Sequence, residues 1–177
     1  LRGATLILVD LDQYWRLAAT YSVRQADLAL ENLAARVVDA MPEATVVGSF
    51  GTTAIAVLTG ETLLPGAMDQ PTLRRLRGDI NGDMTMPDGN GDVFIDPAIG
   101  VAVFPDHGAS ARELLVNATL AAADAARRRP LAWAFCGSRE DDSARQRFEM
   151  HHVIQRGLRR EEFGFRYVPR FAAETSR

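Results

Sequence analysis

The sequence predicts an α/β sandwich, and three patterns support this fold class. Residues 4–11 form a continuous apolar run closed by an acid, which is typical of a strand buried on both faces. Residues 23–41 place apolar side chains at helical spacing, and residues 110–128 form a second, alanine-rich helical pattern. Together with the β-rich segments between them, these elements predict an α/β sandwich that is unlike a doubly wound βαβ repeat.

Two short β-rich runs in the middle of the chain predict a hairpin. They cover residues 45–50 and 53–59, and Gly51-Thr52 separates them. The glycine suits a tight turn because it adopts backbone conformations that side chains disfavour. A short helix is then expected over residues 70–77.

The later part of the chain contains a predicted loop, two strands and a helix. Residues 78–92 are rich in Gly, Asp, Asn and Met and should form an exposed loop. Residues 93–104 should be a strand in which Pro97, lacking a backbone N–H, requires an edge or bulge position. A last strand of this unit is expected over residues 131–135, followed by a polar, amphipathic helix over residues 141–160.

The composition excludes several kinds of active site. All 20 basic residues are arginine, so a Walker-type phosphate lysine, a Schiff-base lysine and a lysine general base are absent. The single cysteine, Cys136, excludes an intrachain disulfide and a thiolate zinc cage. A net charge of −3 argues against a general nucleic-acid binder, so nucleic acid is not an expected partner.

The sequence offers no sign of membrane insertion or secretion. No apolar run reaches the roughly 18–20 residues that span a bilayer, and the N-terminal residues lack the cleavage region of a signal peptide. We therefore expect a cytoplasmic protein, with a membrane-anchored parent as an open alternative.

Two acidic segments resemble the start of a calcium loop but lack its later features. Residues 79–83 and 88–92 alternate acids with turn residues. The glycine that follows in such loops is Met84 in one segment and Val93 in the other, and the bidentate glutamate is missing. Both are interpreted as turns.

The histidines and an arginine run lack the spacing of a ligand site. His151 and His152 are adjacent on a predicted helix and point in different directions, and His107 lies in a predicted turn. We interpret all three as surface residues. The arginines at 127–129 should complement the dipole of the preceding helix and remain solvated, with a phosphate contact as the alternative.

Two acids at the end of the first predicted strand are the strongest candidates for a site. Asp10 and Asp12 flank Leu11 where α/β sheets commonly place ligands. Such a pair could hold Mg²⁺ beside a nucleoside triphosphate, because Mg²⁺ prefers oxygen ligands. An acid that caps the following helix is equally compatible with this pattern.

Two longer segments resemble the GGDEF domains of the diguanylate cyclase family. Residues 9–30 are similar to the family's opening, in which an aspartate-bearing strand precedes a Phe-Lys pair and a helix. Residues 99–126 are similar to its later segment, which runs Ser-Ile-Gly-Val-Ala, Tyr-Pro, Leu-Leu and Ala-Asp-x-Ala. The resemblance covers residues 4–135 and places the signature hairpin at residues 50–58. It implies a GGDEF-like βαββαβ sandwich with a central, mainly antiparallel sheet and flanking helices.

The resemblance assigns only a few nucleotide-site residues to this sequence. Asp10 and the Leu11 carbonyl fall at the family's metal position, and Asp27 falls at an acid that helps to read guanine. Gly51 is the signature glycine that remains. We expect this nucleotide site to be vestigial and the metal position at Asp10 to be empty.

The catalytic part of the signature is replaced. It reads Gly51-Thr52-Thr53-Ala54-Ile55, in which Thr53 and Ala54 stand for two acids that, in the family, complete the Mg²⁺ shell and lie near the reacting hydroxyl. The β-branched Thr52 crowds the space that a glycine would leave for the triphosphate. No complete metal site is then left to neutralise the charge that develops on the phosphoryl group.

Other ligand contacts implied by the resemblance are replaced as well. Trp15 and Ala126 fall at two phosphate-binding lysines, and Ala18 falls at the guanine-reading asparagine. The inhibitory product site aligns near Pro42 and Thr45, without its arginine and aspartate. Diguanylate cyclase activity is therefore not expected.

The C-terminal residues resemble the beginning of an EAL domain, the cyclic di-GMP phosphodiesterase family. Residues 163–168 alternate like a strand, and the similarity rests on Gly157-Leu158, Glu162-Phe163 and Tyr167-Val168-Pro169. The Glu-Ala-Leu motif itself is not in the sequence. We expect residues 1–137 to be a degenerate GGDEF domain, and residues 138–177 to be a connecting helix and the first strand of a truncated EAL domain.

The expected function is that of a catalytically inactive GGDEF domain that regulates or dimerises a signalling protein of GGDEF-EAL type. The alternatives are an allosteric GTP-binding domain that controls an EAL phosphodiesterase, and a residual cyclase. Expected partners are the EAL domain of the same chain, a second copy, and GTP or cyclic di-GMP. No cofactor is expected, and Mg²⁺ only if a nucleotide binds.

Overall fold

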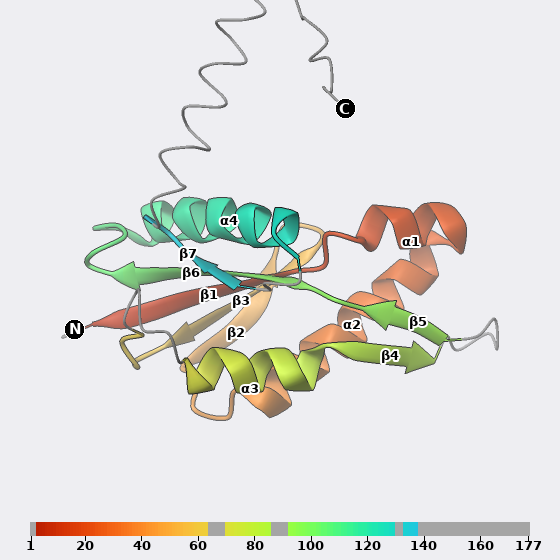
Figure 1. The fold of residues 1–177 in the computed structure, drawn as a ribbon, viewed down its shortest axis with the longest axis horizontal. Helices are drawn as coiled ribbons and strands as arrows, with labels where there is room; N and C mark the ends of the chain where they lie inside the picture. The colour runs from red at the N-terminus through yellow and green to blue at the C-terminus, as the bar shows by residue number, and fades with distance from the viewer. Residues whose placement is uncertain (1–2, 64–69, 86–91, 130–132, 138–177) are drawn as a thin grey trace, which may run out of the picture. The chain divides into compact units, whose positions relative to one another are not determined.

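A sheet of five strands forms the centre of the computed structural model (Figure 1). The structure describes residues 3–63, 70–85, 92–129 and 133–137. The strands are β1 (Ala4–Asp10), β2 (Val46–Phe50), β3 (Ala54–Thr59), β6 (Ala98–Phe104) and β7 (Trp133–Phe135). Their order is β2-β3-β1-β6-β7, and all neighbours are antiparallel except β6 and β7. The expected central, mainly antiparallel sheet is confirmed.

Helices cover both faces of this sheet (Figure 1). Alternate side chains of β1 separate the two layers. Ile7 and Val9 pack with residues of α2 (Val23–Ala40) and α3 (Pro71–Ile80), whereas Leu6 and Leu8 pack against α4 (Ala111–Arg127). The apolar run at the start of the chain is therefore buried on both faces, as the sequence predicted.

Serine caps begin the two long helices. Ser22 Oγ accepts a hydrogen bond from the Gln25 N–H at 3.2 Å, and Ser110 Oγ accepts one from the Glu113 N–H at 3.2 Å. Each bond satisfies a backbone donor that the first helical turn leaves unpaired. The bounds of α2 and α4 agree with the predicted bounds to within one residue at each end.

Gly100 explains how α4 comes close to β6. A Cβ atom at this position would overlap the backbone of α4 at Ala118 and Ala122. The helix face toward the sheet consists largely of alanines, among them Ala118, Ala121, Ala122 and Ala125. Gly100 on β6 and the alanines on α4 therefore allow the backbones of this strand and this helix to pack at short range.

The sequence did not predict α1 (Tyr14–Thr20), which lies between β1 and α2. It has only seven residues, and no side chain caps its first turn. Its two buried residues, Tyr14 and Leu17, are three positions apart, which is one helical turn. That spacing was the only signal, and it is too short to give a periodic pattern.

Two predictions for the segment after residue 77 are wrong. Instead of a continuous loop over residues 78–92, α3 extends to Ile80, and β4 (Gly82–Thr85) pairs with β5 (Asp92–Ile95) in a second, two-stranded sheet. Instead of one strand over residues 93–104, the chain is broken at Asp96-Pro97, and β5 and β6 belong to different sheets. Burial of Met84 and Ile95 in the main core stabilises the small sheet, and Pro97 cannot donate to a continuous ladder.

Several expectations lie outside the described residues. They concern the tip of the predicted loop at residues 86–91, the start of the last strand at 131–132, and the helix and strand expected beyond residue 137. Within the described ranges, no helix has the length and apolar character needed to cross a bilayer.

Candidate functional site

Asp10 lies at the end of β1, between two neighbouring strands. In the sheet register it pairs with Ala54 of β3 and with Ala98 of β6. Its Oδ1 atom accepts a hydrogen bond of 2.8 Å from the Thr53 hydroxyl. Burial raises the pKa of Asp10; the Thr53 hydrogen bond opposes this rise, and the nearby Asp12 charge adds to it.

The predicted hairpin turn lies directly beside Asp10. Gly51 has a φ angle of +63°, a region that favours glycine, so the hairpin prediction and its turn residue are confirmed. The Leu11 N–H donates to the Thr53 carbonyl oxygen at 2.8 Å, which ties the turn to the end of β1. Thr52 is exposed.

The two positions after Thr53 carry apolar side chains. Ala54 is 5% exposed and packs toward α4, and Ile55 is 2% exposed in the main core. Neither can accept a proton or bind a cation. Asp10 therefore faces a hydroxyl and a methyl group across the hairpin, with no second carboxylate from it.

Leu11 and Tyr14 connect this strand end to the following helix. The Leu11 carbonyl oxygen accepts a hydrogen bond from the Tyr14 N–H at 2.8 Å, and the Leu11 side chain is fully buried. This bond begins the turn that leads into α1. The carbonyl oxygen expected at the metal position therefore accepts one hydrogen bond from within the chain.

Asp27 is held by a residue that the sequence reasoning missed. The Tyr14 hydroxyl donates to Asp27 Oδ1 at 2.6 Å. The ring of Tyr14 is buried, whereas Asp27 is exposed on α2. This hydrogen bond is the main cause that raises the pKa of Tyr14, so the phenol stays a neutral donor.

The neighbouring positions offer little to a nucleotide. Ala18 packs against the core with only its methyl group, and the Trp15 side chain is 64% exposed. The Trp15 ring meets Tyr14 edge to face, with 5.0 Å between ring centroids. An indole here provides an aromatic surface and one N–H donor, but no positive charge for a phosphate.

Few protein ligands are available here for a Mg²⁺ ion. Asp10 offers one carboxylate, which accepts a hydrogen bond from Thr53, and the Leu11 carbonyl oxygen already accepts one from Tyr14. Among the residues that the structure describes, no group of three His, Cys, Asp or Glu side chains is arranged to hold a metal. Since Mg²⁺ requires near-octahedral oxygen ligands, the donor set at this sheet end is incomplete.

The arginines after α4 are not simply solvated, which corrects the expectation for residues 127–129. Arg127 and Arg128 both form ion pairs with Asp124, whose side chain is 5% exposed. Arg129 Nη2 lies 2.6 Å from Asp12 Oδ1. Asp12, the second acid of the candidate pair, is therefore paired with an arginine 117 positions later in the sequence.

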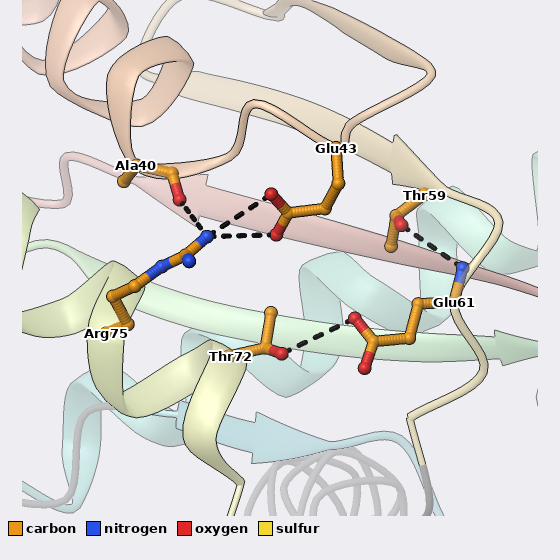
Figure 2. A network of polar contacts seen from close by, with 6 residues as sticks. All are labelled: Ala40, Glu43, Thr59, Glu61, Thr72 and Arg75. Carbon is orange, nitrogen blue, oxygen red and sulfur yellow. Dashed lines mark hydrogen bonds and ion pairs between the residues drawn. The ribbon is translucent and has the colours of Figure 1, made fainter.

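A polar network occupies the region where the product site would align. Arg75, on α3, donates to the Ala40 carbonyl oxygen at 2.7 Å and to Glu43 Oε1 at 3.1 Å (Figure 2). Beside it, the Thr72 hydroxyl lies 3.4 Å from Glu61 Oε2. These contacts join α3 to the end of α2 and to the segment after β3, so they stabilise the packing of these elements.

His107 is the one histidine among the described residues, and it has a structural role. It lies in the turn before α4, as expected, but it is half-buried. The Val103 N–H donates to His107 Nδ1 at 3.0 Å. The interpretation as a simple surface residue is wrong for His107, because this bond closes the turn after β6.

An apolar groove of about 310 Å³ lies beside α4, over β2 and β3. Leu6, Val46, Phe50, Ala56, Leu58, Ala111, Leu114 and Leu115 line it, together with Gly48 and Ser49. No charged side chain is among them, so the groove does not suit a phosphate group.

Comparison with known proteins establishes the fold. No family model matches the sequence, and no curated protein matches it significantly. Among solved structures, the GGDEF domain of TpbB (YfiN) from Pseudomonas aeruginosa superposes with a TM-score of 0.69 at 22% identity, over 81% of this chain and 82% of that chain. The FimX GGDEF domain from the same species gives 0.61 at 27% identity, over 75% and 78% of the two chains. An EAL/GGDEF domain protein from M. capsulatus gives 0.63 at 22% identity, over 77% and 86%. The chain thus has the fold of GGDEF domains.

Proposed function

We propose that residues 1–137 are a catalytically inactive GGDEF domain that serves as a regulatory or dimerisation module in a cyclic di-GMP signalling protein. The observation that carries this proposal is the set of side chains around Asp10. Thr53 and Ala54 stand at the positions of two family acids, and the Thr53 hydroxyl donates to Asp10 at 2.8 Å. A metal held by so few ligands would not neutralise the charge that develops during phosphoryl transfer.

The contacts of the remaining candidate residues support the loss of tight nucleotide binding. Asp27 already accepts a hydrogen bond from Tyr14, and Asp12 already faces Arg129. A nucleotide would therefore share each acid with a donor that already holds it. With Trp15 in place of a lysine, its phosphates would gain no charge pair at this position.

A second candidate function is allosteric binding of GTP, with Mg²⁺ bound only in its company. The observation in its favour is that Asp10, Asp27 and the open turn at Gly51 are all retained, and that a Cβ at Gly51 would meet no atom within 4 Å. Such a ligand would control a partner without being converted. Cyclic di-GMP is the other nucleotide that we propose to test.

We further propose a GGDEF-EAL arrangement in the cytoplasm, in which residues 138–177 begin an EAL domain. The sequence similarity at Glu162-Phe163 and Tyr167-Val168-Pro169 supports this. The M. capsulatus neighbour, an EAL/GGDEF domain protein, shows that this domain pair occurs with the same fold. Downstream coding sequence with a Glu-Ala-Leu motif and acidic metal ligands is the expected result, and its absence would contradict the arrangement.

Titration calorimetry separates the two candidate functions. The full chain is titrated with GTP and with cyclic di-GMP, with and without Mg²⁺, and its mass in solution is measured by sedimentation. The module proposal predicts no heat up to millimolar nucleotide. Saturable heat without turnover would establish the allosteric candidate instead, and formation of cyclic di-GMP from Mg-GTP would overturn both.

A further inference from the structure

Arg129 joins three segments that are far apart in the sequence. Its Nη2 atom donates to Asp12 Oδ1 and to the Asp96 carbonyl oxygen, each at 2.6 Å, and its Nε atom lies 3.3 Å from Asp96 Oδ2. Asp12 follows β1, Asp96 lies between β5 and β6, and Arg129 follows α4. One guanidinium therefore holds the end of a strand, the approach to another strand and the end of a helix.

The cluster around Arg129 is balanced in charge and partly removed from water. Arg77 Nη2, on α3, lies 3.5 Å from Asp96 Oδ1, so that two arginines face two aspartates. The side chains of Arg129 and Asp12 are each 30% exposed, and that of Asp96 is 17% exposed. Solvent screens such pairs less than fully exposed ones, and the planar guanidinium fixes both acids at once.

The same end of the sheet carries the hairpin turn. Leu11, the residue before Asp12, donates its N–H to the Thr53 carbonyl oxygen, and the Thr53 hydroxyl donates to Asp10. Thr53 is thus connected to Arg129 through two polar contacts at Asp10 and Leu11, the chain from Leu11 to Asp12, and the Asp12–Arg129 pair.

The strand β7 begins four residues after Arg129. Among the strands that the structure describes, it lies at the edge and pairs with β6, and the Cys136 N–H donates to the Val101 carbonyl oxygen at 2.8 Å just beyond its end. A short edge strand is held by few hydrogen bonds, so anchoring of the residues before it adds to its stability, beside the packing of Ala134 against Ala121 and Ala125 of α4. Arg129 is the nearest such anchor in the described chain that precedes it.

We propose that Asp12, Asp96 and Arg129 form an electrostatic latch that couples the hairpin turn to β7. While the latch is closed, the end of α4 is fixed on β1 and β6, and β7 stays paired. A ligand or partner that displaces Thr53 shifts the end of β1, weakens the Asp12–Arg129 pair and loosens β7. This coupling stands whether or not the domain binds a nucleotide, so it goes beyond the proposed function.

Amide hydrogen exchange of the full chain, resolved by residue, tests the latch. Asp12→Asn is expected to speed exchange of the Cys136 amide about tenfold and to change that of Val57, in the centre of β3, less than about twofold. Arg127→Gln is the matched control, because it removes an arginine from the same helix end but pairs with Asp124. It should leave Cys136 exchange unchanged.

The coupling to the turn requires a second pair of variants. Thr53→Val removes the hydroxyl that bonds Asp10 and should speed Cys136 exchange several-fold in the native background. In an Arg129→Gln background, the same substitution should have no further effect on Cys136. An unchanged Cys136 rate in Asp12→Asn would overturn the latch, and so would a Thr53→Val effect of equal size in both backgrounds.

Discussion

The Tyr14 hydroxyl donates a 2.6 Å hydrogen bond to Asp27 Oδ1, and this bond joins the short helix α1 to the long helix α2. Tyr14 also donates its backbone N–H to Leu11 at the end of β1. One residue therefore connects two positions that the resemblance to GGDEF domains assigns to a nucleotide. Both accept a hydrogen bond from Tyr14 within the chain.

Tyr14→Phe is expected to lower the midpoint of urea unfolding, because Asp27 loses a donor while the buried ring remains. Tyr21→Phe is the matched control, since Tyr21 is 39% exposed and ends the same helix. It should leave the midpoint within error. Equal midpoints for the native chain and Tyr14→Phe would show that the bond adds nothing to stability.

Asp10 should make stability depend on pH. Burial raises the pKa of Asp10 above its usual value of 3.8, so the folded chain holds this proton more tightly than the unfolded chain. The stability that protonation provides is present below 3.8 and is lost as the pH rises through the folded pKa.

Asp10→Asn cannot ionise, so it should gain stability relative to the native chain as the pH rises. Urea midpoints of both chains at about pH 3 and about pH 7 check this. The urea midpoint of Asp10→Asn minus that of the native chain should therefore be larger at the higher pH. A difference that is constant, or that changes in the other direction, would contradict the assigned cause.

Gly100→Ala should be strongly destabilising, because its Cβ would meet the α4 backbone at Ala118 and Ala122. Overpacking of this kind costs about 2 kcal/mol in the free energy of unfolding, measured by urea denaturation. Gly48→Ala is the control in another strand of the same sheet, where a Cβ meets no atom within 4 Å. It should be neutral or slightly stabilising, and a comparable loss at both positions would argue against close packing of α4 on β6.

Gly51→Ala should cost about 1 kcal/mol in the free energy of unfolding, because a φ angle of +63° disfavours a side chain. Gly60→Ala, just after β3, meets no atom within 4 Å and has no such φ angle. Urea denaturation of the two variants compares them directly. A Gly51→Ala chain as stable as the native one would mean that the turn adopts another conformation.

The sequence predicted the framework because local signals determine it. Ser22 and Ser110 cap the long helices, Gly51 forms the hairpin turn, and the apolar run that ends at Asp10 forms the central strand. Each of these features depends on neighbouring residues, so each is visible as spacing or residue type. The α/β sandwich followed from them, and the resemblance of residues 9–30 and 99–126 implied its GGDEF-like arrangement.

The contacts around the candidate site could not be predicted in the same way. Asp12 and Arg129 are 117 positions apart, and Thr53 lies 43 positions after Asp10. Such pairs form only when the sheet brings distant segments together. The small sheet of β4 and β5 was missed for a related reason: burial of Met84 and Ile95 in the main core outweighs the loop-like composition around them.

The most direct test of the central claim is a turnover measurement on the full chain. The protein is incubated at high concentration with Mg-GTP, in parallel with an active diguanylate cyclase, and the products are separated by chromatography. With Thr53 and Ala54 in place of two acids, we predict that no cyclic di-GMP and no pyrophosphate form above the level of a protein-free control. Cyclic di-GMP that accumulates in proportion to protein concentration would contradict the claim that this domain is catalytically inactive.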